Sequence, residues 1–341
     1  MLGDAPPGLE ALYRAVVGTE ALCTTAAVAA ALERLQTRDL LTLPLPGCGR
    51  TRERFDALSE LGAIDLSLVR LAEGHVDAHA ILAELGATPQ PGCYGVWASE
   101  SKEPVIATPA DGGYVLQGRK RYASGASTLT RALVTARAPD GARLFDVPVR
   151  DPRVHVCAGS WHAVGMAGSD SLDVAFDGLF VPSSGATGAP NSYVERPSFW
   201  HGGVGVAACW YGGALGCAPL LRRSFAEREP DEHAAAHVGQ VRLHCHSMST
   251  LLRRAAAEID ADPQDSLGAA RERALLVRSA VEHGCTMVLE HTHRALGPGP
   301  LVFDAEHARR AADLPVYVRQ HHAERDLAEL GRRALQSGSW P

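Results

Sequence analysis

Apolar residues at helical spacing dominate the beginning of the chain. Thr24–Thr37 and Asp65–Leu85 carry Ala, Val, Leu and Ile with few helix breakers, whereas Leu43–Gly47 contains two prolines and a glycine. This pattern predicts two helices with a loop between them, because proline and glycine interrupt helical periodicity. Gly86–Gly92, which holds two further prolines, closes this helical region.

From Tyr94 to Pro182 the pattern changes to short runs of β-branched and aromatic residues between turn signals. In Leu172–Phe180 apolar and polar positions alternate, which predicts a strand with one buried face. The dipeptides Gly112-Gly113 and Asp140-Gly141 mark turns beside further strand-like runs. Several strands at this spacing predict a small antiparallel barrel or sandwich.

Helical periodicity returns after Pro197 and continues nearly to the end of the chain. Four long segments rich in Ala, Leu and Arg predict an antiparallel four-helix bundle. These segments are 202–225, 234–259, 266–296 and 305–334.

The order of these regions predicts an α+β fold with three consecutive domains. They are an N-terminal helical domain (1–92), a β domain (93–190) and a C-terminal helical bundle (191–341). The chain of 341 residues is long enough for such a division.

The composition argues against nucleic-acid and membrane partners and indicates a cytoplasmic location. The net charge of -6 offers no basic surface for nucleic acid or anionic membrane, and no run approaches the roughly 18 apolar residues of a spanning helix. Met1–Gly8 lacks the pattern of a secretory signal. Eight cysteines without a Cys-x-x-Cys pair predict free thiols in a cytoplasmic protein and no zinc site.

Gly203-x-Gly-x-x-Ala208 matches a loose dinucleotide-binding pattern. A Rossmann site needs a buried strand before the glycines, and Tyr193–Trp200 holds two charges and a proline instead. The favoured interpretation is a helix whose small residues allow close approach to a neighbouring element.

Histidine is abundant, with 15 copies, but its spacing does not favour a metal site. His244 and His246 are two residues apart, as are His291 and His293. Residues at that separation lie on different faces of a helix, so neither pair can share an ion on one face. Solvated or structural histidine is the favoured interpretation, and no metal is predicted.

Two stretches of the β region carry a specific resemblance. Gly112–Ala126 contains a Gly-x-Lys strand ending, and Trp161–Pro182 contains Gly-Met-x-Gly-Ser followed by Val-Pro. Both resemble stretches of the acyl-CoA dehydrogenase family, and the helix, β, helix order agrees with its three domains. The resemblance implies FAD, a homodimer or homotetramer, and FAD lying between the β domain and helices of a second subunit.

The same resemblance implies which residues contact the flavin. Tyr122 and Ser124 match an aromatic and a small hydroxyl residue beside the isoalloxazine ring, where they can cover a face and hydrogen-bond an edge. An earlier strand and loop, and a late glycine-rich turn, complete the implied set. Its members are Trp97, Ala98, Ser99, Gly297 and Gly299.

At the position that matches the family's catalytic glutamate, this sequence has no glutamate. Counting along the last helical segment places His321 there, followed by His322. Histidine can act as a base near neutral pH. A glutamate from another helix remains an alternative, with Glu73 and Glu290 as candidates.

Three functions follow from the resemblance. The first is FAD-dependent oxidation of an acyl thioester or related small molecule, served by an electron-transfer flavoprotein or a flavin reductase. The second, favoured by the missing glutamate, is a two-component monooxygenase that uses reduced flavin and oxygen. The third is a non-catalytic subunit of a flavoenzyme complex, suggested by the short N-terminal region.

Overall fold

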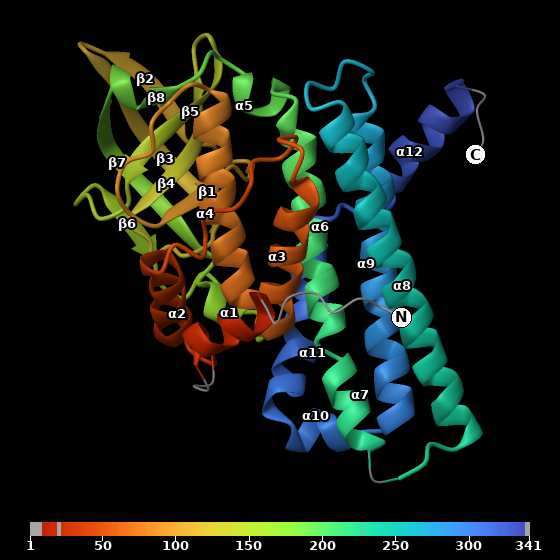
Figure 1. The fold of residues 1–341 in the computed structure, drawn as a ribbon. Helices are drawn as coiled ribbons and strands as arrows, with labels where there is room; N and C mark the ends of the chain where they lie inside the picture. The colour runs from red at the N-terminus through yellow and green to blue at the C-terminus, as the bar shows by residue number, and fades with distance from the viewer. Residues whose placement is uncertain (1–8, 19–21, 227, 338–341) are drawn as a thin grey trace. The chain divides into compact units, whose positions relative to one another are not determined.

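The computed structural model describes residues 9–18, 22–226 and 228–337 (Figure 1). The chain forms two compact units. The helical unit comprises the described residues of Met1–Arg14, Pro44–Val69 and Trp200–Pro341, and the sheet unit comprises those of Ala15–Leu43 and Arg70–Phe199. The units alternate along the sequence. The boundaries 1–92, 93–190 and 191–341 describe consecutive domains and stay a prediction.

The described residues of the sheet unit form eight strands in the order β6-β7-β3-β2-β4-β5-β8, with β1 paired to β4. The strands are β1 (Tyr94–Trp97), β2 (Ile106–Ala110), β3 (Gly113–Ala123), β4 (Arg131–Ala138), β5 (Gly141–Pro148), β6 (Val154–Cys157), β7 (Leu172–Pro182) and β8 (Ala186–Thr187).

The expectation of a purely antiparallel barrel or sandwich is corrected by two parallel pairings. Strand β4 pairs in parallel with both β1 and β2, whereas β2–β3 and β4–β5 are antiparallel. Turn signals such as Asp140-Gly141 identify strands that are neighbours in sequence. They carry no information on β1 and β4, which pair across more distant positions.

Helices cover part of the sheet within this unit. Helix α2 (Thr25–Thr37) begins where predicted, because the Thr24 hydroxyl accepts the Ala27 N–H at 3.1 Å as an N-cap. The second half of α4 (Leu66–Glu84) lies against the sheet (Figure 1). Its Ile81 and Leu82 share a buried cluster with Leu133 and Leu144 of the sheet. Burial of this apolar face stabilises the helix more than intrinsic propensity does.

Among its described residues, the helical unit contains eight helices that lie wholly or mostly within it. They are α3 (Thr51–Ile64), α6 (Ser198–Leu215), α7 (Ala218–Ser224), α8 (Glu232–Ala261), α9 (Ala270–Leu296), α10 (Gly299–Phe303), α11 (Ala305–Tyr317) and α12 (Glu324–Ser337). Helices α1 (Leu9–Val17) and α4 divide their residues between the two units, and the short α5 (Ser192–Glu195) belongs to the sheet unit.

Three helical predictions need correction. Helix α3 was not predicted, because its many charged residues conceal a buried face. The segment 202–225 is two helices, and 305–334 is α11, a 3-10 turn (Val318–Gln320) and α12. Pro315 lies in the last turn of α11 and Ala323 has a φ of 45°, so the second segment cannot continue as one helix.

Helix α6 is the most apolar helix of the bundle. The stretch Ser198–Ser224 is long and apolar enough to cross a membrane, which corrects the expectation that no stretch approaches that composition. Most of it is buried inside the molecule, which is the pattern of a core helix.

Helices α3 and α6 cross at two glycines. A Cβ at Gly212 would lie 2.2 Å from the Ser59 carbonyl oxygen and 2.8 Å from the Gly62 Cα. At Gly205 the nearest atoms, on Leu58 and Phe55, would be 3.7 Å away. Close approach by small residues is therefore a property of α6, but it occurs at Gly212 and not within the Gly203–Ala208 motif.

Candidate flavin site of the sheet unit and polar centres of the helical unit

Strand pairing brings the two motif stretches together. Strands β3 and β7 are antiparallel, with Ala123 opposite Leu172 and an irregularity between Lys120 and Ala123. Beyond the strands, the Gly125 N–H donates to the Ser169 carbonyl at 2.8 Å, and the Ala126 N–H donates to the Asp170 carbonyl at 3.1 Å. The sequence stretches 112–126 and 161–182 therefore form one surface of the sheet unit.

Tyr122 lies in the irregularity between the paired strands. Its φ is 57°, in the left-handed region, and its side chain is 61% exposed. Left-handed backbone is costly for a bulky residue and is often found at binding sites. The ring is available to cover an aromatic ligand.

Ser124 lies two residues further, at the start of a buried chain of hydroxyls. Its Oγ is 2.9 Å from Ser171 Oγ, which is 2.8 Å from Ser169 Oγ. Ser169 Oγ donates to the Met166 carbonyl at 2.7 Å. All three serines are buried, so Ser124 is held by a rigid polar network.

The earlier strand and loop support this surface. Trp97 is 1% exposed and its indole N–H donates to the Ser124 carbonyl at 3.0 Å, so the ring positions Ser124 from within the core. Ser99 Oγ donates to the Arg121 carbonyl at 2.5 Å, which ties the loop to the strand irregularity. Ala98, between them, is partly buried.

Lys120 is a further member of this site that the sequence prediction missed. Its ammonium donates to the Ser99 carbonyl at 3.0 Å and to Thr135 Oγ1 at 2.7 Å. Burial lowers the pKa of Lys120 to about 8. The lysine of the Gly-x-Lys motif was the available signal, as were the hydroxyls Ser169 and Ser171 beside the Gly-Met-x-Gly-Ser motif.

The glycine-rich turn belongs to the helical unit. Gly297 caps α9 with a φ of 69°, and Gly299 begins α10. A Cβ on either glycine would meet no atom within 4 Å. Val302 and Phe303 follow with 68% and 88% exposed side chains. This turn therefore has an open outer side.

The two candidate catalytic histidines have different environments. His321 follows the 3-10 turn, not a helix as predicted, and it is buried with Nε2 2.9 Å from Ser279 Oγ. Its Nδ1 is buried and has no hydrogen-bond partner among the residues that the structure describes. Burial lowers the pKa of His321, so the ring is neutral at neutral pH. His322 is exposed, and its backbone N–H donates to Asp326 at 3.1 Å.

The two glutamates that were alternative candidates for the catalytic base both form ion pairs with arginines. Glu73 is buried and accepts from Arg70 at 2.5 Å, within the sheet unit. Glu290 lies on the exposed face of α9 with Arg294 at 3.4 Å.

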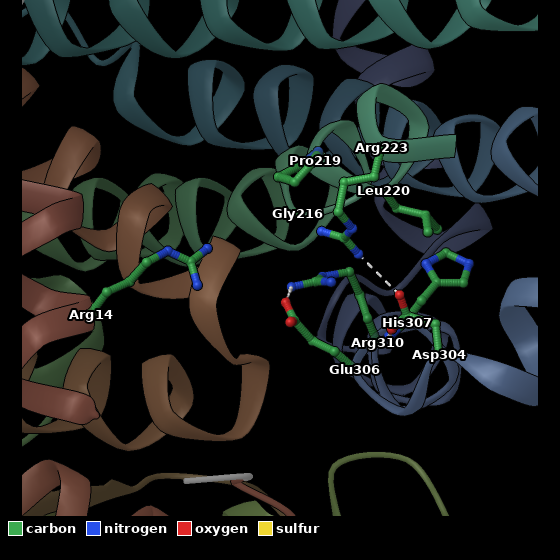
Figure 2. Close-up of a pocket in the computed structure, with 9 residues that line it drawn as sticks. All are labelled: Arg14, Gly216, Pro219, Leu220, Arg223, Asp304, Glu306, His307 and Arg310. Carbon is green, nitrogen blue, oxygen red and sulfur yellow. Dashed lines mark hydrogen bonds and ion pairs between the residues drawn. The ribbon is translucent and has the colours of Figure 1, made fainter. Parts of the chain in front are cut away.

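The helical unit also contains a polar cavity of about 250 Å3, which sequence reasoning missed (Figure 2). Figure 2 shows Arg223 paired with Asp304, and Arg310 paired with Glu306. The nitrogen–oxygen distances of these ion pairs are 3.0 and 3.1 Å. The cavity is lined by Arg14, Gly216, Pro219, Leu220, Arg223, Asp304, Glu306, His307 and Arg310.

His307 is the most deeply buried titratable group of this cavity, at 1% exposure. Its Nε2 is 3.1 Å from His293 Nε2, and Asp304 caps its helix by accepting the His307 backbone N–H. Burial, followed by repulsion from protonated His293 and from Arg310, lowers the pKa of His307 to about 4. The folded protein therefore favours neutral His307.

This depressed pKa predicts a loss of stability in mild acid. An unfolded histidine titrates near 6.5, so the contribution of neutral His307 is complete above that pH and is lost as the pH falls toward about 4. The free energy of unfolding of the wild type should fall between pH 7.5 and pH 4. In His307→Gln we expect this fall to be smaller by about 3 kcal/mol. Urea titrations across this range measure it, with exposed His322→Gln as the control. Equal pH dependence in His307→Gln and the wild type would contradict this assignment.

The arrangement of helices and strands is that of the acyl-CoA dehydrogenase fold. Methanesulfinate monooxygenase MsuC from Pseudomonas fluorescens matches with a TM-score of 0.80 and 18% identity, over 99% of this chain and 98% of that chain. Dibenzothiophene monooxygenase TdsC from Paenibacillus sp. A11-2, solved with FMN and indole, matches with a TM-score of 0.77 and 20% identity, over 98% and 96%. KijD3, solved with FMN and a dTDP-linked sugar, has a TM-score of 0.80 and 16% identity, over 100% and 96%.

A protein that is similar in sequence over a short stretch is also an oxygenase. The oxygenase component of FADH2-dependent resorcinol hydroxylase from Rhizobium sp. (strain MTP-10005) is 35% identical over 80 residues. The match covers 23% of this chain and 20% of that relative. No protein-family model matches the chain. The fold is thus shown over the full chain, and these similar proteins include monooxygenases.

Proposed function

We propose that this protein is the oxygenase component of a two-component flavin-dependent monooxygenase. The full-length likeness to monooxygenase structures supports this function over acyl-thioester oxidation. The resorcinol hydroxylase relative is itself an oxygenase component, which supports a separate flavin reductase as the partner. A cytoplasmic location suits such a pair.

The residues of the sheet unit fit a flavin. Tyr122 offers an exposed aromatic face, and Ser124 offers a hydroxyl oriented by buried neighbours. Arg119 and Arg121 are well exposed on the same strand, at 3.8 and 3.9 Å from the carboxylate of Asp173, and their outer N–H groups can donate to a phosphate. These residues suit FMN or FAD equally, since both carry the same ring and a phosphate. Bound in its reduced form, the flavin would supply the electrons that activate oxygen.

The helical unit contains the proposed acid-base group. His321 is neutral, and we propose that it accepts a proton from a substrate hydroxyl. Removing that proton makes a phenolic ring more electron-rich and more reactive toward an oxidant. We propose a small phenolic or heteroaromatic substrate. Exposed His322 orients the loop through its backbone bond to Asp326.

The turn containing Gly297 and Gly299 is proposed to approach the flavin of a second subunit. Its open outer side and the exposed Val302 and Phe303 support contact with another chain. A homodimer or homotetramer would bury these apolar side chains, which are costly to leave in water.

Anaerobic flavin mixing tests the proposed function. We expect the protein to bind photoreduced FMN or FAD, and to form hydroxylated product from resorcinol when oxygen is admitted. His321→Asn should retain flavin binding and lose product, since it removes the proton acceptor and leaves the sheet unit unchanged. Bleaching of protein-bound oxidised flavin by butyryl-CoA without oxygen would instead identify a dehydrogenase. Failure to bind either flavin would support a non-catalytic subunit.

A further inference from the structure

The three buried serines of the sheet unit form a chain with a direction. A carbonyl oxygen can only accept, so Ser169 donates its one hydroxyl proton to Met166 at 2.7 Å. Ser169 must then accept the proton of Ser171 at 2.8 Å. Ser171 in turn must accept the proton of Ser124 at 2.9 Å. In the order Ser124→Ser171→Ser169→Met166, read from donor to acceptor, every hydroxyl proton has an acceptor.

The opposite order makes one hydrogen bond fewer. If Ser169 donated to Ser171, and Ser171 to Ser124, the bond from the Ser169 hydroxyl to the Met166 carbonyl would be lost. Exposures of 0% for Ser169 and 8% for Ser171 leave little access for water to replace it. One hydrogen bond between neutral groups is worth about 1 kcal/mol, which favours the first order by roughly fivefold.

The end of the chain is anchored by an unusual turn. Met166 and Asp170, on either side of the 3-10 turn Ala167–Ser169, have φ values of 58° and 49°. The Met166 carbonyl also accepts the Ser169 backbone N–H at 3.0 Å, and Asp170 accepts the Ser127 backbone N–H at 2.6 Å. The geometry of this turn holds the terminal acceptor in place.

We infer that the serine chain makes Ser124 a hydrogen-bond acceptor toward its ligand and so favours reduced over oxidised flavin. This inference rests on the proposed function. Because the Ser124 proton is directed inward, its Oγ offers only lone pairs to a bound ring. Reduced isoalloxazine carries an N–H at the N5 position, where the oxidised ring carries a bare nitrogen. An acceptor therefore suits the reduced form, and the oxidised form requires the serine chain to reverse.

Selectivity for reduced flavin serves an oxygenase component that receives its flavin from a reductase. Oxidised flavin is the competing ligand at the same surface. A preference set by buried hydroxyls involves no charged group, so ionic strength does not affect it. A preference set by exposed arginines would be weakened by salt.

The test is the ratio of two dissociation constants, for oxidised FMN and for photoreduced FMN, measured anaerobically. Ser171→Ala removes the inward acceptor and frees the Ser124 proton to face the ligand. We expect the ratio of oxidised to reduced dissociation constants to fall about five- to tenfold. Ser169→Ala makes the two chain directions similar, so its ratio should also fall. Ser183→Ala, at the far end of the β3–β7 pair, should keep the wild-type ratio.

A ratio within one variant is insensitive to general loosening of the site, because both ligands are affected alike. The two-electron midpoint potential of bound FMN gives an independent readout and should fall by about 20 to 30 mV in Ser171→Ala. An unchanged ratio and potential in both alanine variants, with normal thermal unfolding, would overturn the inference. If the wild type binds neither flavin form, the proposed function fails at that earlier step.

Discussion

Replacing Gly212 with alanine is expected to lower the free energy of unfolding by about 3 kcal/mol. The added Cβ would lie 2.2 Å from the Ser59 carbonyl oxygen, a backbone atom that cannot rotate away. Helices α3 and α6 would have to separate, which opens the apolar interface around them. Overpacking of this kind typically costs about 1–3 kcal/mol, and more where the backbone itself must shift. Chemical denaturation of the purified protein measures the effect.

The matched control is Gly205→Ala on the same helix. There the new methyl group would contact Leu58 and Phe55 at 3.7 Å, an ordinary packing distance. Because alanine is the better helix former by about 1 kcal/mol, this variant should be as stable as the wild type or more so. Equal stability of the Gly212 and Gly205 variants would mean that α3 and α6 do not cross as described.

The second large effect is expected on flavin binding. Ser124→Leu puts a branched side chain where a buried hydroxyl stands and breaks the bond to Ser171. We expect the dissociation constant for FMN to rise by between tenfold and a hundredfold, since overpacking and the lost polar contact together cost about 1.5–3 kcal/mol. Fluorescence titration with FMN measures the change.

Ser127→Leu is the control for this substitution, because Ser127 is exposed and only its backbone N–H is used, by Asp170. Tyr122→Ala provides a second variant that does not disturb the core, as the ring is 61% exposed. It should weaken FMN binding about tenfold through loss of aromatic contact area. Unchanged affinity in a folded Ser124→Leu protein and in Tyr122→Ala would exclude this surface as the flavin site.

The proposed chemistry depends on the proposed role of His321. A carboxylate base suits removal of a weakly acidic proton beside a thioester, whereas neutral His321 suits a more acidic hydroxyl. The same fold can serve either reaction, because function is determined by the site and not by the architecture. This is why the fold likeness and the proposed monooxygenation are separate conclusions.

The sequence by itself determined the order of helical and β regions, most helix and strand positions and the stretches that form the candidate flavin surface. These features depend on local periodicity, turn residues and short motifs, all of which are readable along the chain. It also predicted Tyr122 and Ser124 as flavin contacts by position in a motif, and this assignment stays a prediction. It did not identify α3, whose buried face is interrupted by charges, nor the break between α11 and α12 after Tyr317.

Only the tertiary structure decided the contacts between residues distant in sequence. These include the parallel pairing of β1 with β4, the crossing of Gly62 and Gly212, and the hydroxyl chain from Ser124 to Ser169. It likewise distinguished buried His321 from exposed His322, although the two are adjacent in sequence. The reason is physical: burial and hydrogen bonding are set by which elements pack together, and local pattern constrains that packing only weakly.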